Sequence, residues 1–102
     1  MKFAVMCCLA GCSVMPTFAQ DTAEAIYKLK CAMCHGADGL SNTPAGKVFK
    51  AASFSDPAVV KTPDGDLIAI VQKGKNKMPA FADKLTEAQI KSVVDYIHTL
   101  QK

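Results

Sequence analysis

Apolar residues near the C-terminus recur every three to four positions, which is the spacing of one face of an α-helix. The pattern predicts a helix from Thr86 to about Gln101. The apolar stripe of this helix consists of Ile90, Val93, Val94, Ile97 and Leu100. A stripe this continuous predicts that the helix packs one whole face against the rest of the protein.

A second periodic segment predicts an N-terminal helix from Asp21 to Cys34. Asp21 can cap its first turn, and Glu24 follows at the spacing of a capping box. Gly36 is placed to end the helix. The apolar residues at helical spacing are Ala23, Ile26, Tyr27, Leu29 and Met33.

Between these helices, prolines and glycines divide the chain into short segments. Asp56-Pro57 predicts a helix that runs to about Lys61, and Thr62-Pro63-Asp64 predicts another that ends before Gly74. Two predicted loops, 36–55 and 75–85, take up the rest. The apolar anchors of the first loop are Leu40, Val48, Phe49 and Phe54. No segment alternates as a strand does, so the predicted fold class is all-α, with three to five helices.

Residues 1–19 have the composition of a signal peptide. Lys2 precedes an apolar stretch over residues 3–15, and Thr17-Phe18-Ala19 offers a small-residue cleavage site. The stretch is too short to span a bilayer comfortably. We therefore predict cleavage after Ala19, which leaves residues 20–102 as one domain in the periplasm. The alternative is a lipobox over residues 9–12, which would anchor the protein to the membrane through a lipidated Cys12.

Of the five cysteines, only Cys31 and Cys34 lie outside the predicted leader. His35 follows directly, and Cys-x-x-Cys-His is the pattern of covalent haem attachment. Residues three apart lie on one helix face, so both thiols can reach one porphyrin edge while His35 binds the iron. The alternatives are a zinc site completed by His98 and a dithiol redox pair, which needs a βαβ setting. Neither alternative requires a histidine at this position.

The candidates for the second axial ligand of the iron are Met33, Met78 and His98. Met33 lies between the cysteines and is expected to point away from the porphyrin. His98 lies at the margin of the C-terminal stripe, where a surface histidine is the simpler interpretation. Met78 lies in a lysine-rich loop that Pro79 stiffens, so we predict that His35 and Met78 bind the iron. The predicted cofactor-binding residues are Cys31, Cys34, His35 and Met78.

Ligation by histidine and methionine fills both axial positions and raises the reduction potential. No position remains open for a substrate, so the predicted function is one-electron transfer between redox proteins. We predict no catalytic residues and no enzymatic turnover. The alternatives are a haem subunit of a larger dehydrogenase or oxidase complex and a ligand-sensing haem protein.

The chain carries 12 basic and 9 acidic residues, a net charge of +3, and every basic residue is lysine. Removal of the leader lowers the net charge to about +2, which is not the signature of a nucleic-acid-binding protein. The lysines near the predicted haem ligands are Lys28, Lys30, Lys73, Lys75 and Lys77. They form either a docking surface for an acidic redox partner or an ordinary solvated surface.

Three segments together resemble the class I c-type cytochromes, above all the small soluble bacterial and photosynthetic members. They are CAMCH at residues 31–35, KNKMPAF around Met78, and LTEAQIKSVVDYI in the C-terminal helix. The resemblance covers residues 21–102. It implies a cytochrome c fold wrapped around one covalent haem c, a monomeric state, and work in a chain of redox proteins such as a respiratory chain.

The resemblance also implies roles for individual residues. The carbonyl of Pro44 would accept a hydrogen bond from the His35 ring, and Tyr27 would cross Val93 and Tyr96. No tryptophan is available to bind a haem propionate. The candidates for propionate contacts are Asn42, Thr43, Lys47, Ser53 and Gln72.

Overall fold

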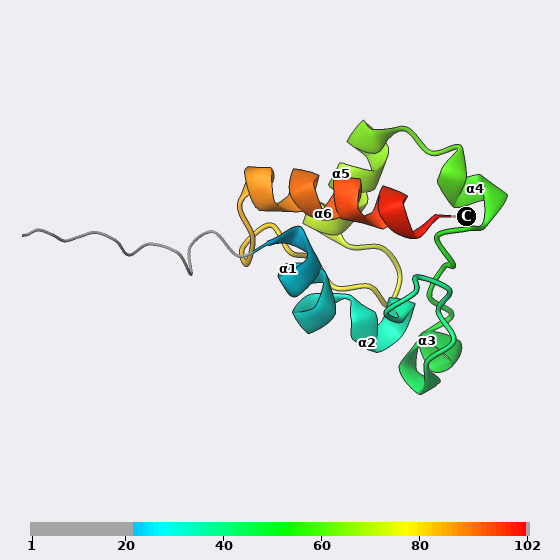
Figure 1. The fold of residues 1–102 in the computed structure, drawn as a ribbon. Coiled ribbons are helices and arrows are strands. Elements are labelled where there is room, and N and C mark those ends of the chain that lie inside the picture. The colour runs from blue at the N-terminus through cyan, green and yellow to red at the C-terminus, as the bar shows by residue number, and fades with distance from the viewer. Residues whose placement is uncertain (1–21, 102) are drawn as a thin grey trace, which may run out of the picture.

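The computed structural model describes residues 22–101, which form six helices and no strand (Figure 1). In chain order the helices are α1 (Ala23–Lys30), α2 (Ala32–His35), α3 (Pro44–Phe49), α4 (Pro57–Val60), α5 (Asp64–Lys73) and α6 (Glu87–Leu100). The all-α prediction is confirmed, with one helix more than the expected upper limit. The predicted leader lies outside the described residues.

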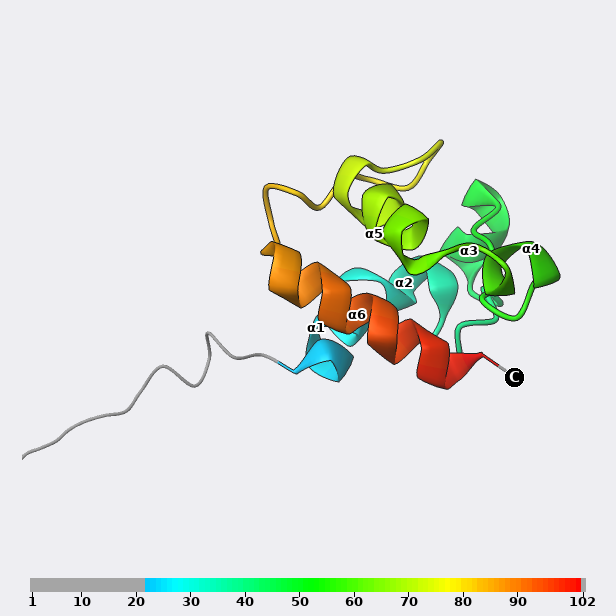
Figure 2. The same ribbon diagram turned by 90° about the horizontal axis from the view of Figure 1, so that it is seen from above.

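Helix α6 packs against α1, and the two helices lie side by side in both ribbon views (Figures 1 and 2). Tyr27 of α1 is fully buried against α6, where its ring lies 5.3 Å from that of Tyr96, and Val93 is 1% exposed. The implied helix crossing is therefore confirmed. The buried core consists of Ile26, Tyr27, Phe54, Val71, Phe81, Leu85, Ile90, Val93, Val94 and Ile97.

Helix α6 begins where the sequence predicted. The Thr86 hydroxyl accepts from the Gln89 N–H at 3.1 Å, and the Gln89 side chain accepts from the Thr86 N–H at 2.8 Å. This capping box satisfies two N–H groups that would otherwise lack helical partners.

The prediction of one continuous helix from Asp21 to Cys34 is wrong in two respects. Thr22, rather than Asp21, caps α1, and Glu24 forms an ion pair with Lys28 at 2.8 Å instead of a capping box. The helix is also interrupted at Cys31, whose φ of −119° separates α1 from α2. Leu29 and Met33, which were expected on the apolar face, do not face the core and are 78% and 77% exposed.

The predicted loop 36–55 contains α3, which the sequence analysis missed. Thr43 caps this helix through a 2.9 Å hydrogen bond from the Gly46 N–H, and Pro44 occupies its first turn. Of the predicted anchors, Phe54 is buried, but Val48 is 72% exposed. Phe49 is about half exposed.

The remaining short helices agree with their predicted starts and stops. Asp56 caps α4 by accepting from the Ala58 N–H at 2.9 Å, and Gly74 ends α5 with φ at +78°. Across residues 22–101, no helix has both the length and the apolar character that a membrane span requires.

Candidate haem-binding site

A cavity of about 600 Å³ lies between the helices, and all four predicted cofactor-binding residues line it. Cys31, Cys34 and His35 come from α2 and the break before it, whereas Met78 comes from the loop after α5. The apolar part of the wall includes Phe54, Leu67, Ile70, Val71, Phe81, Val93, Val94 and Ile97. Folding thus brings together two parts of the chain that are more than forty positions apart.

The His35 ring is fixed through one of its nitrogens. Its Nδ1 lies 3.0 Å from the Ala52 carbonyl oxygen, which can only accept, so Nδ1 carries the proton. The lone pair of Nε2 is therefore available to a metal in the neutral ring. Burial lowers the pKa of His35, against the opposing effect of the Ala52 hydrogen bond, and so favours that neutral form. The Phe54 ring stacks on the imidazole at 4.5 Å.

The expectation that Pro44 provides the acceptor for this ring is wrong. Pro44 begins α3, where a carbonyl points along the helix axis towards the next turn. Ala52 follows α3 in an irregular segment that returns past His35. The Ser41 hydroxyl donates to the same Ala52 oxygen at 2.6 Å. A main-chain acceptor leaves no side-chain signal, which is why sequence analysis missed Ala52.

The two thiols are partly buried, and α3 packs closely on the Cys34 carbonyl. Burial, opposed by Lys30 and reinforced by Cys34, raises the pKa of the Cys31 thiol to about 11. The Thr43 hydroxyl donates to the Cys34 carbonyl at 2.8 Å. A Cβ at Gly46 would collide with that carbonyl, so only glycine permits this approach.

Tyr27 fixes the C-terminal end of the haem-attachment motif, just after His35. Its buried hydroxyl donates to the Gly36 carbonyl at 2.6 Å. Burial raises the pKa of Tyr27, so the phenol keeps its proton and remains a donor. The helix crossing and the haem motif are therefore connected directly.

Met78 is presented by a tight turn. Lys75 and Met78 exchange backbone hydrogen bonds of 3.1 and 2.9 Å, and Asn76 between them adopts a left-handed conformation with φ at +55°. The Met78 carbonyl lies only 2.6 Å from where a Cβ on Gly74 would be. The absence of a side chain at Gly74 therefore lets the turn fold back onto the end of α5.

Two further hydrogen bonds fasten this loop to α5. The Phe81 N–H donates to the Val71 carbonyl at 2.9 Å, and the Ala82 N–H donates to the Gln72 carbonyl at 3.2 Å. The Phe81 side chain is buried beneath the loop. Met78 is thus held between two fixed points, Gly74 and Phe81.

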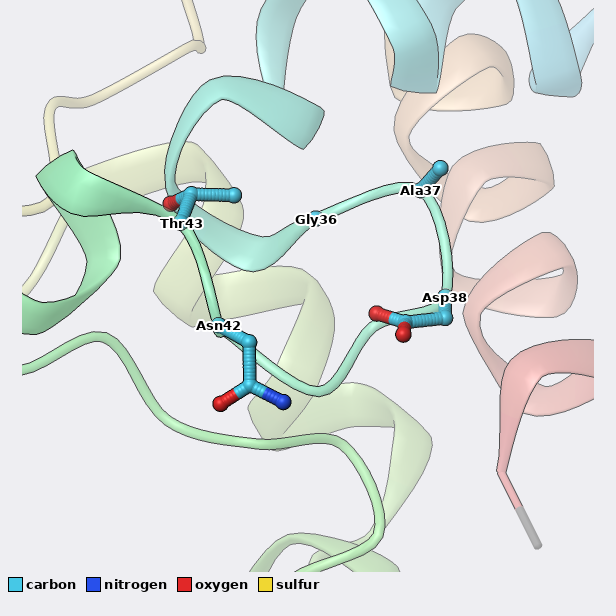
Figure 3. A pocket seen from close by; sticks show the side chains of 5 residues that line it. All are labelled: Gly36, Ala37, Asp38, Asn42 and Thr43. Carbon is cyan, nitrogen blue, oxygen red and sulfur yellow. The ribbon is translucent and has the colours of Figure 1, made fainter.

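Three of the lysines singled out from the sequence, Lys30, Lys75 and Lys77, line the cavity, and Lys50 joins them. Lys28 instead pairs with Glu24. None of the five propionate candidates lies in the cavity wall. Two of them line a separate depression of about 280 Å³ in the loop between α2 and α3, formed by Gly36, Ala37, Asp38, Asn42 and Thr43 (Figure 3).

The alternative interpretations of the motif find no support in residues 22–101. No three His, Cys, Asp or Glu side chains in this range gather as a metal site. His98 lies between Asp64, 2.7 Å from Nε2, and Gln101, 2.8 Å from Nδ1. This range also has no βαβ unit for a dithiol pair.

The residues present fit a haem. The cavity volume is in the range of cofactor sites, its wall is mainly apolar, and its donors are one imidazole nitrogen, one thioether and two thiols. The imidazole is in the tautomer that iron ligation requires.

Comparisons with known proteins agree with this site. The family described as "Cytochrome C oxidase, cbb3-type, subunit III" matches residues 14–97. A cytochrome c6 from Synechococcus sp. is 36% identical over 84 residues, which cover 80% of this chain and 72% of that protein. A cytochrome c6 from Gracilaria tenuistipitata var. liui is 31% identical over 100 residues, which cover 93% and 87%.

A solved structure described as KustC0563 c-type cytochrome superposes with a TM-score of 0.73 at 30% identity, covering 80% of this chain and all of that one. The family match, the relatives and the shared fold lead to one conclusion. The chain belongs to the c-type cytochrome family matched at residues 14–97, and it is a small class I cytochrome that carries electrons with a covalently bound haem c.

Proposed function

We propose that His35 and Met78 are the axial ligands of the haem iron, and that Cys31 and Cys34 form the thioether bonds. The observation that supports this most strongly is that all four residues line one cavity. The haem, when bound, supplies a ferric/ferrous couple that exchanges one electron. The Ala52 carbonyl holds the proton of His35 on Nδ1, which leaves Nε2 free to face the iron, and the turn at Asn76 presents Met78 to the same cavity.

With both axial positions filled, the protein transfers electrons and has no enzymatic turnover of its own. The apolar wall keeps water from the cofactor, which stabilises the less charged ferrous state and raises the reduction potential. The cytochrome c6 relatives favour this role over those of a complex-bound subunit or a ligand sensor.

Redox potentiometry combined with absorption spectra of the holoprotein tests this proposal. We expect one haem c, a single one-electron transition, and spectra typical of histidine–methionine ligation in both states. The ferrous protein should not bind carbon monoxide, because no axial position is open. Ready binding of carbon monoxide would instead favour a ligand-sensing role.

The partners that we propose are redox proteins with acidic docking patches. Lys30, Lys75 and Lys77 lie at the cavity, where electrons would enter and leave, and no acidic residue other than Asp56 lines it. Such charges steer the encounter more than they tighten the complex.

The docking surface predicts a dependence on ionic strength. The association rate with a native partner should fall as salt is raised, because screening shortens the reach of the lysine charges. Stopped-flow measurement of electron transfer checks this dependence. The Lys28→Gln variant is the control, because the charge of Lys28 is already paired with that of Glu24. A rate that does not change with salt would remove the docking surface from the proposal.

We place this carrier in the periplasm, as a protein that loses residues 1–19. The composition of the leader supports this placement. Mass spectrometry of the mature N-terminus should find Gln20 first. A lipidated Cys12 would mean that the protein is anchored to a membrane.

A further inference from the structure

Ser41 is a buried polar residue, and electron transfer itself does not require a serine at this position. It is 8% exposed, and its φ of +59° lies in the left-handed region, which residues other than glycine rarely adopt. Its N–H donates to the His35 carbonyl at 2.8 Å. A strained conformation held against a haem ligand is an observation that calls for a functional hypothesis.

The Ser41 hydroxyl and the His35 ring share one acceptor. The hydroxyl donates to the Ala52 carbonyl oxygen at 2.6 Å, and the ring Nδ1–H donates to the same oxygen at 3.0 Å. The hydroxyl oxygen is 3.5 Å from Nδ1. A carbonyl oxygen has two lone pairs and can accept both bonds. Each donor, however, draws electron density from the oxygen and so weakens the hydrogen bond that the other donor makes.

The position of the hydroxyl is fixed by packing around Ser41. Its carbonyl lies against α3, only 2.8 Å from where a Cβ on Gly46 would be. The backbone of Ser41 is therefore held from two sides, by His35 and by α3. The side chain has little freedom to leave the Ala52 oxygen.

The strength of the bond at Nδ1 affects the metal. A stronger acceptor gives the imidazole more imidazolate character, which stabilises ferric iron and lowers the reduction potential. We propose that Ser41 is a positioning residue: its hydroxyl weakens the bond from His35 to Ala52 and thereby holds the reduction potential up. This inference rests on the proposed ligation of the iron by His35.

Potentiometry of the Ser41→Ala and Ser41→Gly holoproteins tests the inference. Both variants lack the hydroxyl, but glycine adopts a φ of +59° without strain. Both should shift to lower potential by a similar amount, so that the ferric-to-ferrous ratio at a fixed applied potential rises about threefold, a fraction of one hydrogen bond. The control is Thr99→Ala, which removes an equally short bond of 2.6 Å to the Tyr96 carbonyl, on α6, and should leave the potential unchanged.

Two results would overturn the role of the hydroxyl. One is a wild-type potential in both Ser41 variants. The other is a shift in Ser41→Ala alone, because that would assign the effect to backbone strain. If the wild-type protein itself lacked histidine–methionine spectra, the proposed function would fail instead, so the two failures can be told apart.

A measurement on the wild-type protein makes the test independent of whether the variants fold. In the reduced holoprotein, proton NMR should detect a slowly exchanging Ser41 hydroxyl proton with a nuclear Overhauser contact to the proton on His35 Nδ1. The absence of that contact, with the Nδ1 proton itself visible, would contradict the shared acceptor.

Discussion

At the scale of single residues, Met78 is the proposed ligand whose loss would change the chemistry of the protein most. Replacement by alanine should open one axial position, lower the reduction potential and allow carbon monoxide to bind the ferrous form. The open position should also permit adventitious peroxidase activity. Absorption spectra and potentiometry measure these changes.

Met33→Ala is the matched control, because Met33 is 77% exposed and does not line the cavity. This variant should keep the spectra and potential of the wild type. Spectra that are identical in wild type and Met78→Ala would exclude Met78 as the ligand.

His98 joins three segments of the chain by hydrogen bonds. The Gln101 amide donates to the Phe54 carbonyl at 3.1 Å, so its oxygen is left to accept from His98 Nδ1. Asp64 of α5 lies at Nε2, so both ring nitrogens face an acceptor, which favours the protonated ring. The hydrogen bonds to Gln101 and Asp64, helped by the charges of Asp64 and Asp95, raise the pKa of His98.

This arrangement predicts how the stability of the protein depends on pH. The pKa of His98 is higher in the folded than in the unfolded state. The contribution of His98 to the stability of the folded protein is therefore complete below the unfolded pKa of about 6.5. It is lost as the pH rises through the folded value. Denaturation of the holoprotein at a series of pH values should show this decline, and the His98→Ala variant should lack it. The same decline in both proteins would exclude His98 as its source.

At the scale of elements, the Met78 loop depends on its approach to the end of α5. Gly74→Ala would place a Cβ 2.6 Å from the Met78 carbonyl at a φ of +78°, which should cost about 1–3 kcal/mol. Chemical denaturation should show this loss, and the spectra should show weakened methionine ligation.

Gly65→Ala is the control within the same helix, since a Cβ at Gly65 meets no atom within 4 Å. Its stability should equal or slightly exceed that of the wild type, because alanine is the better helix former. Equal stability of Gly74→Ala and Gly65→Ala would show that the loop can move away from α5 without loss.

The sequence predicted those helices whose first turn carries a local signal. α4, α5 and α6 begin at the expected residues, because Asp56-Pro57, Thr62-Pro63-Asp64 and Thr86-Glu87 are local signals. The break at Cys31 could not be predicted, since the apolar pattern runs on without interruption through it. α3 could have been found from Thr43-Pro44, which is a capping residue followed by proline.

The types of side chain in the sequence predicted the cofactor-binding residues better than they predicted the groups that orient those residues. Cys31, Cys34, His35 and Met78 are rare residue types in a recognisable order, and the structure gathers them in one cavity. Which main-chain oxygen orients His35 depends on how the segment after α3 returns, and that is decided by tertiary packing. For the same reason, the propionate candidates, chosen for polarity alone, do not line the cavity.

At the scale of the whole molecule, the cavity opens into the apolar core, and core residues such as Val71 and Phe81 line it. Leu67 and Ile70 of α5 line it and are only half-buried, although their helix carries its apolar face towards the interior. A protein of this size buries little surface by itself, so the cofactor supplies much of the missing contact.

This dependence on the cofactor predicts that the haem-free chain is largely unfolded. The double variant Cys31→Ala/Cys34→Ala, which cannot form thioethers, should show little helical circular dichroism and no cooperative thermal transition when prepared without haem. The wild-type holoprotein provides the reference. A cooperative transition in the haem-free chain would show that the apolar core suffices.

The cavity also separates the chain into two functional halves. The attachment motif and its support lie before residue 55, whereas Met78 and the helices that hold its loop lie after residue 63. A chain cut in the α4 region would therefore yield one fragment that keeps the haem and a second that supplies the thioether of Met78 together with α5 and α6. Their reassembly would restore the high potential. The absorption spectrum and the reduction potential of such a split protein would therefore report whether its two fragments have associated.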